Sequence, residues 1–238
     1  MNRMFFVSEC ESTNDSVKDY VDPVNTGITA LCTFHQTKGK GQYGNKWQEV
    51  KNQNIAITLA LPVKLITLAD SLFNYYTAVL LRDFVANLTK CGVKTKWPND
   101  LIINDRKISG ILIEKKKIHG EPYLITGIGI NVTGENFADI PNAGSIYTET
   151  GVKYDLKILA EQLFAFFERN LANLPSKEEI LQNYNSNLYR KDQISCFQLN
   201  NQRQNGIIKS ADENGFLWID LEHDGLSKFF HKEIAMLY

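Results

Sequence analysis

The longest regular pattern in this sequence lies between residues 67 and 89, where apolar side chains recur at every fourth position. This spacing places them on one face of an amphipathic helix, and Thr67 with Asp70 predicts a capping box at its start. β-Rich runs precede the helix at 4–7, 28–34 and 54–61 and follow it at 93–97, 100–103, 107–118 and 122–132. A long helix among so many strands predicts a helix packed on a sheet, the α+β class.

The chain changes character from Lys191 onward. Four short β-rich runs, at about 194–199, 205–211, 215–221 and 226–230, are separated by clusters of turn residues. This pattern predicts a small β-barrel appended to the first unit. Two more helices are expected before it, at about 155–173 and from Ser176, where Glu179 completes a capping box. We therefore expect two domains, residues 1–190 and 191–238.

Composition excludes several classes of protein. The 26 Lys and Arg residues balance 27 Asp and Glu, which argues against a general nucleic-acid binder with a basic face. No stretch approaches the roughly 20 apolar residues that a membrane-spanning helix needs. The four cysteines lie far apart, a spacing that fits neither a zinc site nor a disulfide framework. A reducing cytoplasm is the expected location.

A long polar stretch, residues 36–53, separates two predicted strands. Within it, residues 39–44 read Gly-Lys-Gly-Gln-Tyr-Gly and match the spacing of a dinucleotide-binding motif. That fold needs the glycines to open a helix, and no helical pattern follows them, so we reject it. Two interpretations remain: backbone amides that converge on an anion, or a flexible solvated loop.

Residues 96–100 read Lys-Trp-Pro-Asn-Asp. Pro98 restricts Trp97 to an extended conformation, so the pair forms a flat apolar wall suited to a ring. Asp100 adds a carboxylate of the kind that binds Mg²⁺ beside phosphates. The alternative is a structural turn with a tryptophan in the core.

Two later strands carry further candidates. Strict alternation predicts that Lys107 shares a face with Ser109 and Ile111, and Gly110 indicates the close approach of another group. Gly127 and Gly129 lie two residues apart and remove side chains from one strand face. They therefore predict a slot for a flat ligand, or alternatively a bulge or tight sheet packing.

Taken in order, these clusters resemble the biotin–protein ligase family, in the short form that lacks an N-terminal DNA-binding domain. The resemblance is dense over residues 8–132, and the β-rich tail is similar to the C-terminal SH3-like β-barrel of that family. It rests on Ser12, Thr13, Asn14, Gln36, the 39–47 loop, residues 96–100, Lys107, Gly110 and residues 127–131. It implies a catalytic domain of the class II synthetase-like biotin/lipoate ligase fold, with a mixed, mainly antiparallel sheet flanked by helices.

The resemblance also implies a two-step reaction. Biotin and MgATP first give biotinoyl-5′-AMP and pyrophosphate, and the amine of a lysine on a biotin carboxyl carrier protein then attacks the mixed anhydride. The first step brings two anions together, so cations must offset their repulsion. Lys107 is the expected catalytic cation between the biotin carboxylate and the α-phosphate, because an ammonium is a compact point charge.

The same resemblance assigns the remaining residues. Those expected to bind biotin are Ser12, Thr13, Asn14, Gln36, Gly39, Lys40, Gly41, Gln42, Lys107, Gly110, Gly127 and Gly129. Those expected to bind ATP or the adenylate are Lys40, Gln42, Trp47, Asn99, Asp100, Lys107 and Asn131, with Asp100 also a ligand of Mg²⁺. Trp47 and Trp97 are expected to enclose the valeryl chain or the adenine.

Two departures from the family pattern bear on function. The family loop has arginines where this chain has Lys40, Gln42 and Asn45, so we hypothesise that the adenylate escapes more readily here. The site motifs begin at residue 12, which leaves no room for a DNA-binding module before them, and we expect no operator binding.

Two other functions stay open. A lipoate–protein ligase shares the fold and the adenylation chemistry, and a non-catalytic relative would bind biotin without turnover. A free edge of the central sheet is expected to pair with the carrier domain or with a second copy of the chain.

Overall fold

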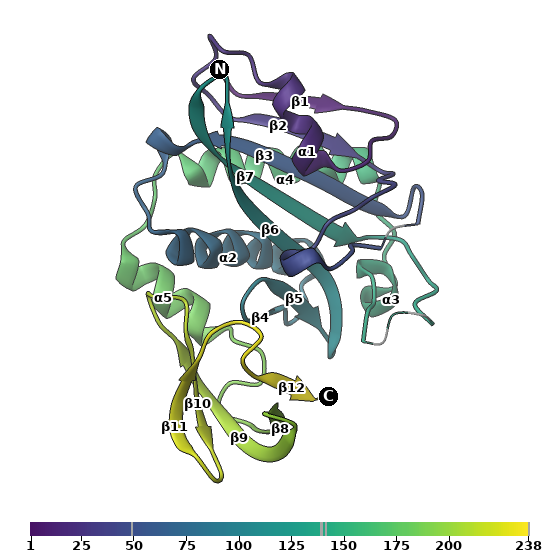
Figure 1. Ribbon diagram of the computed structural model, residues 1–238. Coiled ribbons are helices and arrows are strands. Elements are labelled where there is room, and N and C mark those ends of the chain that lie inside the picture. Colours follow the sequence, from purple (N-terminus) through teal and green to yellow (C-terminus); the bar gives the residue numbers. More distant parts are fainter. Residues whose placement is uncertain (49, 139, 141, 238) are drawn as a thin grey trace.

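The computed structural model describes residues 1–48, 50–138, 140 and 142–237. It contains a seven-stranded sheet in the order β1-β2-β3-β7-β6-β5-β4 and a five-stranded sheet in the order β11-β10-β9-β8-β12. Figure 1 shows the smaller sheet below the larger one, at the C-terminal end of the chain. Residue 49, within the predicted polar loop, lies outside the described residues.

The large sheet contains every strand predicted for the first unit. The strands are β1 (Arg3–Phe6), β2 (Thr29–Thr33), β3 (Asn54–Pro62), β4 (Lys94–Lys96), β5 (Asp100–Ile103), β6 (Arg106–Ile118) and β7 (Glu121–Asn131). Among the described strand pairs of this sheet, β1 and β2 run parallel and the others antiparallel. The expected mixed, mainly antiparallel sheet is confirmed.

The predicted helices are present with altered ends. The α-helices are α1 (Thr13–Ser16), α2 (Asp70–Thr89), α3 (Ile146–Thr150), α4 (Leu156–Leu171) and α5 (Lys177–Ser186). Short 3₁₀ turns are η1 (Val17–Tyr20), η2 (Gln42–Gly44) and η3 (Val63–Leu65). The capping box of α5 is confirmed, because Ser176 Oγ accepts from the amide of Glu179 and the Glu179 carboxylate accepts in return.

The capping box predicted for the long helix is wrong. α2 begins at Asp70, three residues later than expected, with Ala69 as its N-cap and no side-chain cap. The prediction of a single apolar face was also too narrow, since Phe73, Tyr75 and Leu81 are buried as well as the every-fourth residues. The reason is that α2 packs against α4 and α5 in addition to the sheet.

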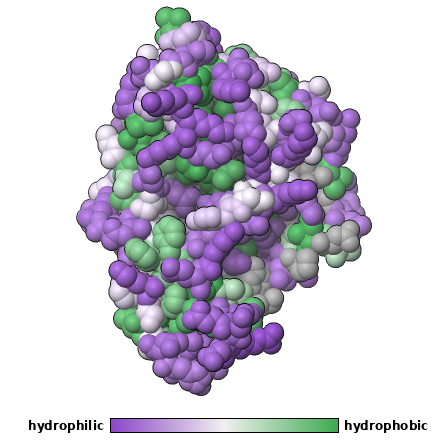
Figure 2. All heavy atoms as spheres, in the orientation of Figure 1, coloured by the Kyte–Doolittle hydropathy of each residue, from purple (hydrophilic) through white to green (hydrophobic). Residues whose placement is uncertain are grey.

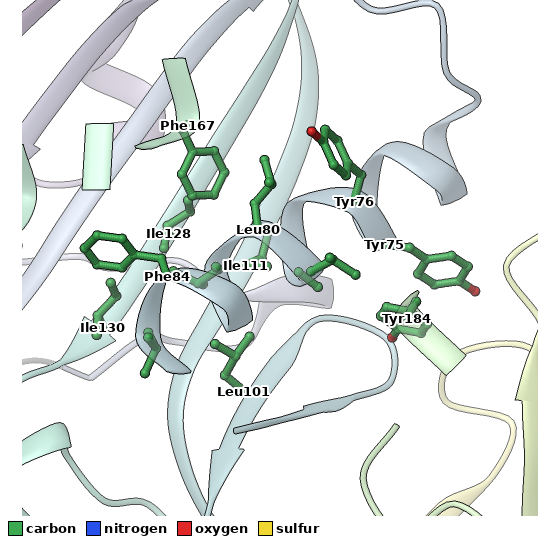
Figure 3. Close-up of a cluster of buried hydrophobic side chains, with 14 of the residues drawn as sticks. Tyr75, Tyr76, Leu80, Phe84, Leu101, Ile111, Ile128, Ile130, Phe167 and Tyr184 are labelled. Atoms are coloured by element: carbon green, nitrogen blue, oxygen red, sulfur yellow. The ribbon is translucent and has the colours of Figure 1, made fainter. Parts of the chain in front are cut away.

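The main core lies between the sheet and these helices, and Figure 3 shows part of it. β3 illustrates the division: Ile55, Ile57 and Leu59 join the core with the helices, whereas Ala56 and Thr58 alternate to the opposite face. α2 and α4 lie behind the sheet in Figure 1 and α1 lies in front of it. The front face, which Figure 2 shows as mostly hydrophilic, is therefore the one left available for a site.

The small sheet consists of β8 (Ile194–Leu199), β9 (Gln202–Ala211), β10 (Leu217–Leu221), β11 (Gly225–Phe229) and β12 (Ala235–Leu237). Its described strand pairs are antiparallel, and its strand order is open at β11 and β12 rather than closed into a barrel. Asn185 of α5 fastens it to the first unit by exchanging two hydrogen bonds with the Ala211 backbone, at 2.9 and 2.7 Å. The domain boundary between residues 190 and 191 stays a prediction.

No helix in the described part of the chain is both long and apolar enough to span a membrane.

Candidate active site

A row of small residues crosses three strands on the front face. Ala56 of β3 lies opposite Gly129 of β7, which lies opposite Gly110 of β6, which in turn lies opposite Asp100 of β5. The next row contains Thr58, Gly127 and Leu112. The first row has no large side chain and the second has one glycine, so they leave a depression in the sheet, and a cavity of about 150 Å³ lies above it.

The slot predicted at the two glycines of β7 exists, but side chains of this chain occupy it. The indole of Trp47 lies on Gly129, where a Cβ atom would come 2.7 Å from Nε1. The amide of Asn14 lies on Gly127 in the same way. The glycines are therefore required by close packing, and they place an indole and an amide against the cavity.

A β-bulge directs Lys107 into the cavity. Leu101 pairs with Ser109 and Ile102 pairs with Lys107, so Ile108 is an extra residue on β6. The predicted face sharing of Lys107 with Ile111 is therefore wrong, because alternation breaks at the bulge. A Cβ on Gly110 would lie 3.5 Å from Lys107 Cε, which places the lysine on the glycine face.

The ammonium of Lys107 forms the charged end of the cavity. Its Nζ lies 2.7 Å from Asp100 Oδ1 and 5.6 Å from the centroid of the Trp47 ring. The lysine side chain is 35% exposed and the aspartate side chain 19%, so solvent screens this pair only in part. Burial lowers the pKa of neighbouring Lys96; Asp100 opposes this shift and Lys107 adds to it.

The turn that carries Asp100 is held from several sides. The Trp97–Pro98 peptide bond is cis, and the Pro98 carbonyl accepts from Asn74 at 2.8 Å and from the Tyr184 hydroxyl at 3.2 Å. Asn99 bonds twice to Ile111, through its side-chain amide and through its carbonyl. These contacts fix the position of Asp100 relative to β6, and Asn99 itself lines the cavity.

Uncharged groups form the opposite end of the cavity. The Oε1 atom of Gln36 accepts from the amide of Thr13 at 2.8 Å and from its hydroxyl at 3.0 Å. The Thr58 hydroxyl lies 2.8 Å from the Thr13 hydroxyl and 2.7 Å from Asn14 Oδ1. Asn14 Nδ2 donates to Glu114 at 2.9 Å. This network is largely buried, so it holds Thr13, Asn14 and Gln36 in single orientations.

The glycine-containing loop closes the cavity from the front. Its two arms are joined by Gly41 N donating to the Asn45 carbonyl at 2.7 Å and by Trp47 N donating to the Gly39 carbonyl at 3.0 Å. Lys40 pairs with Asp15 of α1, and this hydrogen bond raises the pKa of the ammonium. Both of these side chains are nearly half exposed, so the ion pair is weak. The Lys40 ammonium can therefore leave Asp15 for another anion.

Two residues predicted for the site lie outside the cavity lining. Asn131 is buried at the end of β7, where its Oδ1 accepts from Asn54 and its Nδ2 donates to the Gly144 carbonyl, both at 2.8 Å. The 142–144 segment that it holds pairs with the Lys107 backbone, so Asn131 supports the lysine from behind. Gly39 is the second, and it permits the close approach of the Trp47 backbone.

Trp97 also lies elsewhere than expected. Its Nε1 donates to the carbonyl of Gly215, in the turn between β9 and β10, at 3.3 Å, and the residue lines a neighbouring groove rather than the cavity. Trp97 therefore contributes to the junction between the two sheets.

The other predicted residues meet in one place. The predicted residues that line the cavity are Ser12, Thr13, Asn14, Gln36, Lys40, Gly41, Gln42, Trp47, Asn99, Asp100, Lys107, Gly110, Gly127 and Gly129. Sequence reasoning missed Thr58, which bonds to Thr13 and Asn14. It also missed several lining residues, among them Ala56, Ile111, Leu112, Ile128 and His231. Thr58 carries no motif, and His231 reaches the cavity from the segment between β11 and β12, so no local signal pointed to either.

Comparison with known proteins gives a consistent result. The bifunctional ligase/repressor BirA of Escherichia coli is 26% identical over 229 residues, covering 92% of this chain and 68% of the relative. The biotin–[acetyl-CoA-carboxylase] ligase of Mycobacterium tuberculosis is 26% identical over 229 residues, covering 90% of this chain and 82% of the relative.

A solved structure agrees over nearly the whole chain. The biotin protein ligase from Aquifex aeolicus in complex with biotin and ATP superposes with a TM-score of 0.81 at 25% identity, covering 99% of this chain and 98% of that one. The model of the biotin/lipoate A/B protein ligase family matches residues 9–131, just over half of the chain. The matched residues include strands β2 to β7 of the large sheet and every predicted site residue, and the chain therefore belongs to the biotin/lipoate A/B protein ligase family.

Proposed function

We propose that this chain is a biotin–protein ligase. It joins biotin to ATP to give biotinoyl-5′-AMP and pyrophosphate, and then transfers biotin to a lysine of a biotin carboxyl carrier protein. Two of the proteins described above, those of Mycobacterium tuberculosis and Aquifex aeolicus, are biotin ligases by name, and the second is bound to biotin and ATP. The observation that carries the proposal is the cavity itself, which has a neutral polar end at Thr13 and Gln36 and a charged end at Lys107 and Asp100.

In the first step, a carboxylate oxygen of biotin forms a bond to the α-phosphorus of ATP. The bond from that phosphorus to the oxygen bridging to the β-phosphate breaks, and pyrophosphate leaves with the electron pair. Lys107 is the cation that lines the cavity beside Asp100, and it would lie between the two reacting anions. Its ammonium reduces their repulsion and stabilises the charge that grows in the transition state.

Biotin has a ureido ring without charge, and neutral hydrogen-bonding groups suit it. The proposed contacts are Ser12, Thr13, Asn14 and Gln36, and the network around Thr58 holds the last three in place. The Trp47 Nε1 atom is buried and has no hydrogen-bond partner among the described residues. A buried donor without a partner requires an explanation, and a bound substrate would supply the acceptor.

The residues also fit Mg²⁺ that arrives with ATP. Mg²⁺ usually takes one or two carboxylates and completes its shell with phosphate oxygens and water. Asp100 is the carboxylate that lines the cavity, and the described residues include no cluster of three acidic, His or Cys side chains. When bound, the ion would neutralise phosphate charge beside Lys107.

In the second step, the amine of the acceptor lysine forms a bond to the carbonyl carbon of biotin. The bond from that carbon to the phosphate oxygen breaks, AMP leaves with the electron pair, and the amine loses its proton to solvent. The chain contributes mainly by holding the anhydride still, since a fixed geometry supplies much of the acceleration in such reactions.

The acceptor is proposed to dock on the open part of β6. β5 pairs with β6 up to Gly110, whereas β7 pairs with it as far as Ile118. Residues 113–118 therefore have a strand on one side and, among the described residues, no strand on the other. Such an edge accepts an additional strand, from the carrier domain or from a second copy of this chain. We also propose a cytoplasmic location, because the four cysteines lie far apart in the sequence, with neither the spacing of a zinc site nor that of a disulfide framework.

The lipoate alternative is tested by titration calorimetry with biotin and with lipoate on the same preparation. A biotin ligase binds biotin and shows ATP–pyrophosphate exchange that depends on biotin. Preferential binding of lipoate would replace the proposal, and biotin binding without exchange would indicate a non-catalytic relative.

A further inference from the structure

The tip of the glycine-containing loop carries an aromatic side chain that points away from the central sheet. Tyr43 lies in the 3₁₀ turn Gln42–Gly44, and its φ of 55° is in the left-handed region that few residues other than glycine adopt. The residue is 55% exposed. The turn therefore presents the ring outward instead of packing it on the strands that anchor the loop.

That ring lies on the segment that connects β11 and β12 of the C-terminal sheet. The Tyr43 and His231 rings are stacked, with centroids 4.6 Å apart and planes 22° from parallel. Lys232 Nζ lies 4.8 Å from the Tyr43 ring centroid and donates to the Tyr43 carbonyl at 3.4 Å. His231 packs edge-on against Trp97, with centroids 5.8 Å apart. The loop is thus attached to a segment far along the chain.

The stacked rings lie where the cavity meets a neighbouring groove. His231 and Gln42 line both the cavity and a neighbouring groove of about 510 Å³, and Tyr43 lines the groove. When the tip is attached, the loop covers Lys107 and the glycine rows. The ring stack and the hydrogen bond from Lys232 join residues 42–44 to the C-terminal part of the chain, so loss of these contacts would free the tip of the loop beside the groove.

We propose that Tyr43 and His231 are positioning residues that hold the loop closed through the C-terminal sheet, so that the acyl-adenylate stays in the cavity until the acceptor amine arrives. This rests on the proposed function. An aromatic stack of this kind corresponds to roughly two- to tenfold in an equilibrium, so its loss changes retention by a measurable factor.

The test compares Tyr43→Asn with Tyr43→Phe. Asparagine adopts the left-handed conformation more readily than most residues, so it preserves the turn and removes the ring, whereas phenylalanine keeps the ring. Two rates are measured without acceptor: ATP–pyrophosphate exchange reports formation of the adenylate, and steady-state pyrophosphate release reports its escape. We expect the ratio of release to exchange to rise two- to tenfold in Tyr43→Asn and to match the parent in Tyr43→Phe. An unchanged ratio in Tyr43→Asn overturns the proposal.

A double variant identifies the partner. If Tyr43 acts through His231, the combined Tyr43→Asn and His231→Ala variant shows a ratio no higher than the larger single effect. Effects that multiply overturn the pairing, because they would mean that each residue acts alone.

Hydrogen exchange separates this proposal from the proposed function. In the ligand-free protein, the amide hydrogens of residues 40–46 are expected to exchange faster in Tyr43→Asn than in the parent or in Tyr43→Phe. Equal exchange in all three overturns the attachment whether or not the protein is a ligase. Absence of pyrophosphate exchange in the parent overturns the ligase function and leaves this measurement valid.

Discussion

The indole of Trp47 fills the space that a side chain at residue 129 would occupy, and this contact defines one wall of the cavity. The glycine is needed for that reason and not for backbone conformation, since Gly129 lies in regular strand β7 opposite Gly110.

Gly129→Ala is therefore expected to displace the indole and weaken biotin binding. Overpacking costs about 1–3 kcal/mol, which corresponds to a rise in Kd of roughly 5- to 150-fold. Titration calorimetry measures it, with Gly92→Ala as the control because no heavy atom lies within 4 Å of a Cβ there. Equal biotin affinity in both variants would show that the indole does not shape the binding site.

Asn131→Ala is expected to destabilise the protein. The change leaves the Asn54 amide and the Gly144 carbonyl buried without their partner, at about 1–3 kcal/mol each. We expect the free energy of unfolding in urea to fall by about 2–4 kcal/mol, whereas Asn183→Ala on an exposed position of α5 changes it little.

The same pair of variants distinguishes two roles. If Asn131→Ala is as stable as Asn183→Ala but binds ATP more weakly, Asn131 contacts the nucleotide directly, as its sequence motif predicted. Loss of stability supports the structural role instead.

Gln42→Arg is expected to retain the adenylate better. The side chain at this position lines the cavity, and a charge-assisted hydrogen bond to phosphate contributes about 1.5–3 kcal/mol, or roughly 10- to 100-fold. The readout is biotin transferred to a bystander protein, which we expect to fall in Gln42→Arg. Gln182→Arg adds the same charge on exposed α5 and should label like the parent. Equal labelling by parent, Gln42→Arg and control would remove the hypothesis.

Local patterns predicted the strands and helices well. Alternation along a strand and an apolar residue at every fourth position of a helix both follow from which side chains are buried. The capping box at Thr67 failed because the helix begins at Asp70, and a polar residue near a helix start is a weak signal without the backbone geometry. The bulge at Ile108 was not predictable, since one unpaired residue leaves no mark in composition. It is nevertheless what directs Lys107 toward Asp100.

Most of the candidate site was also found from motifs, since glycines, amides and the lysine cluster along the first half of the chain. Trp97 was misplaced because its partner, Gly215, lies far along the chain in the turn between β9 and β10. His231 was missed for the same reason. Contacts between elements far apart in sequence depend on how the two sheets dock, and no local pattern reports on that.

The most direct test of the account is ATP–pyrophosphate exchange with and without biotin, in the parent and in Lys107→Ala. The side chain of Lys107 lines the cavity, whereas Lys117 is an exposed lysine on the same strand and Lys117→Ala serves as the control. We predict exchange that requires biotin, a loss of roughly 100- to 1000-fold in Lys107→Ala, and a parental rate in Lys117→Ala. Exchange at the parental rate in Lys107→Ala would contradict the account.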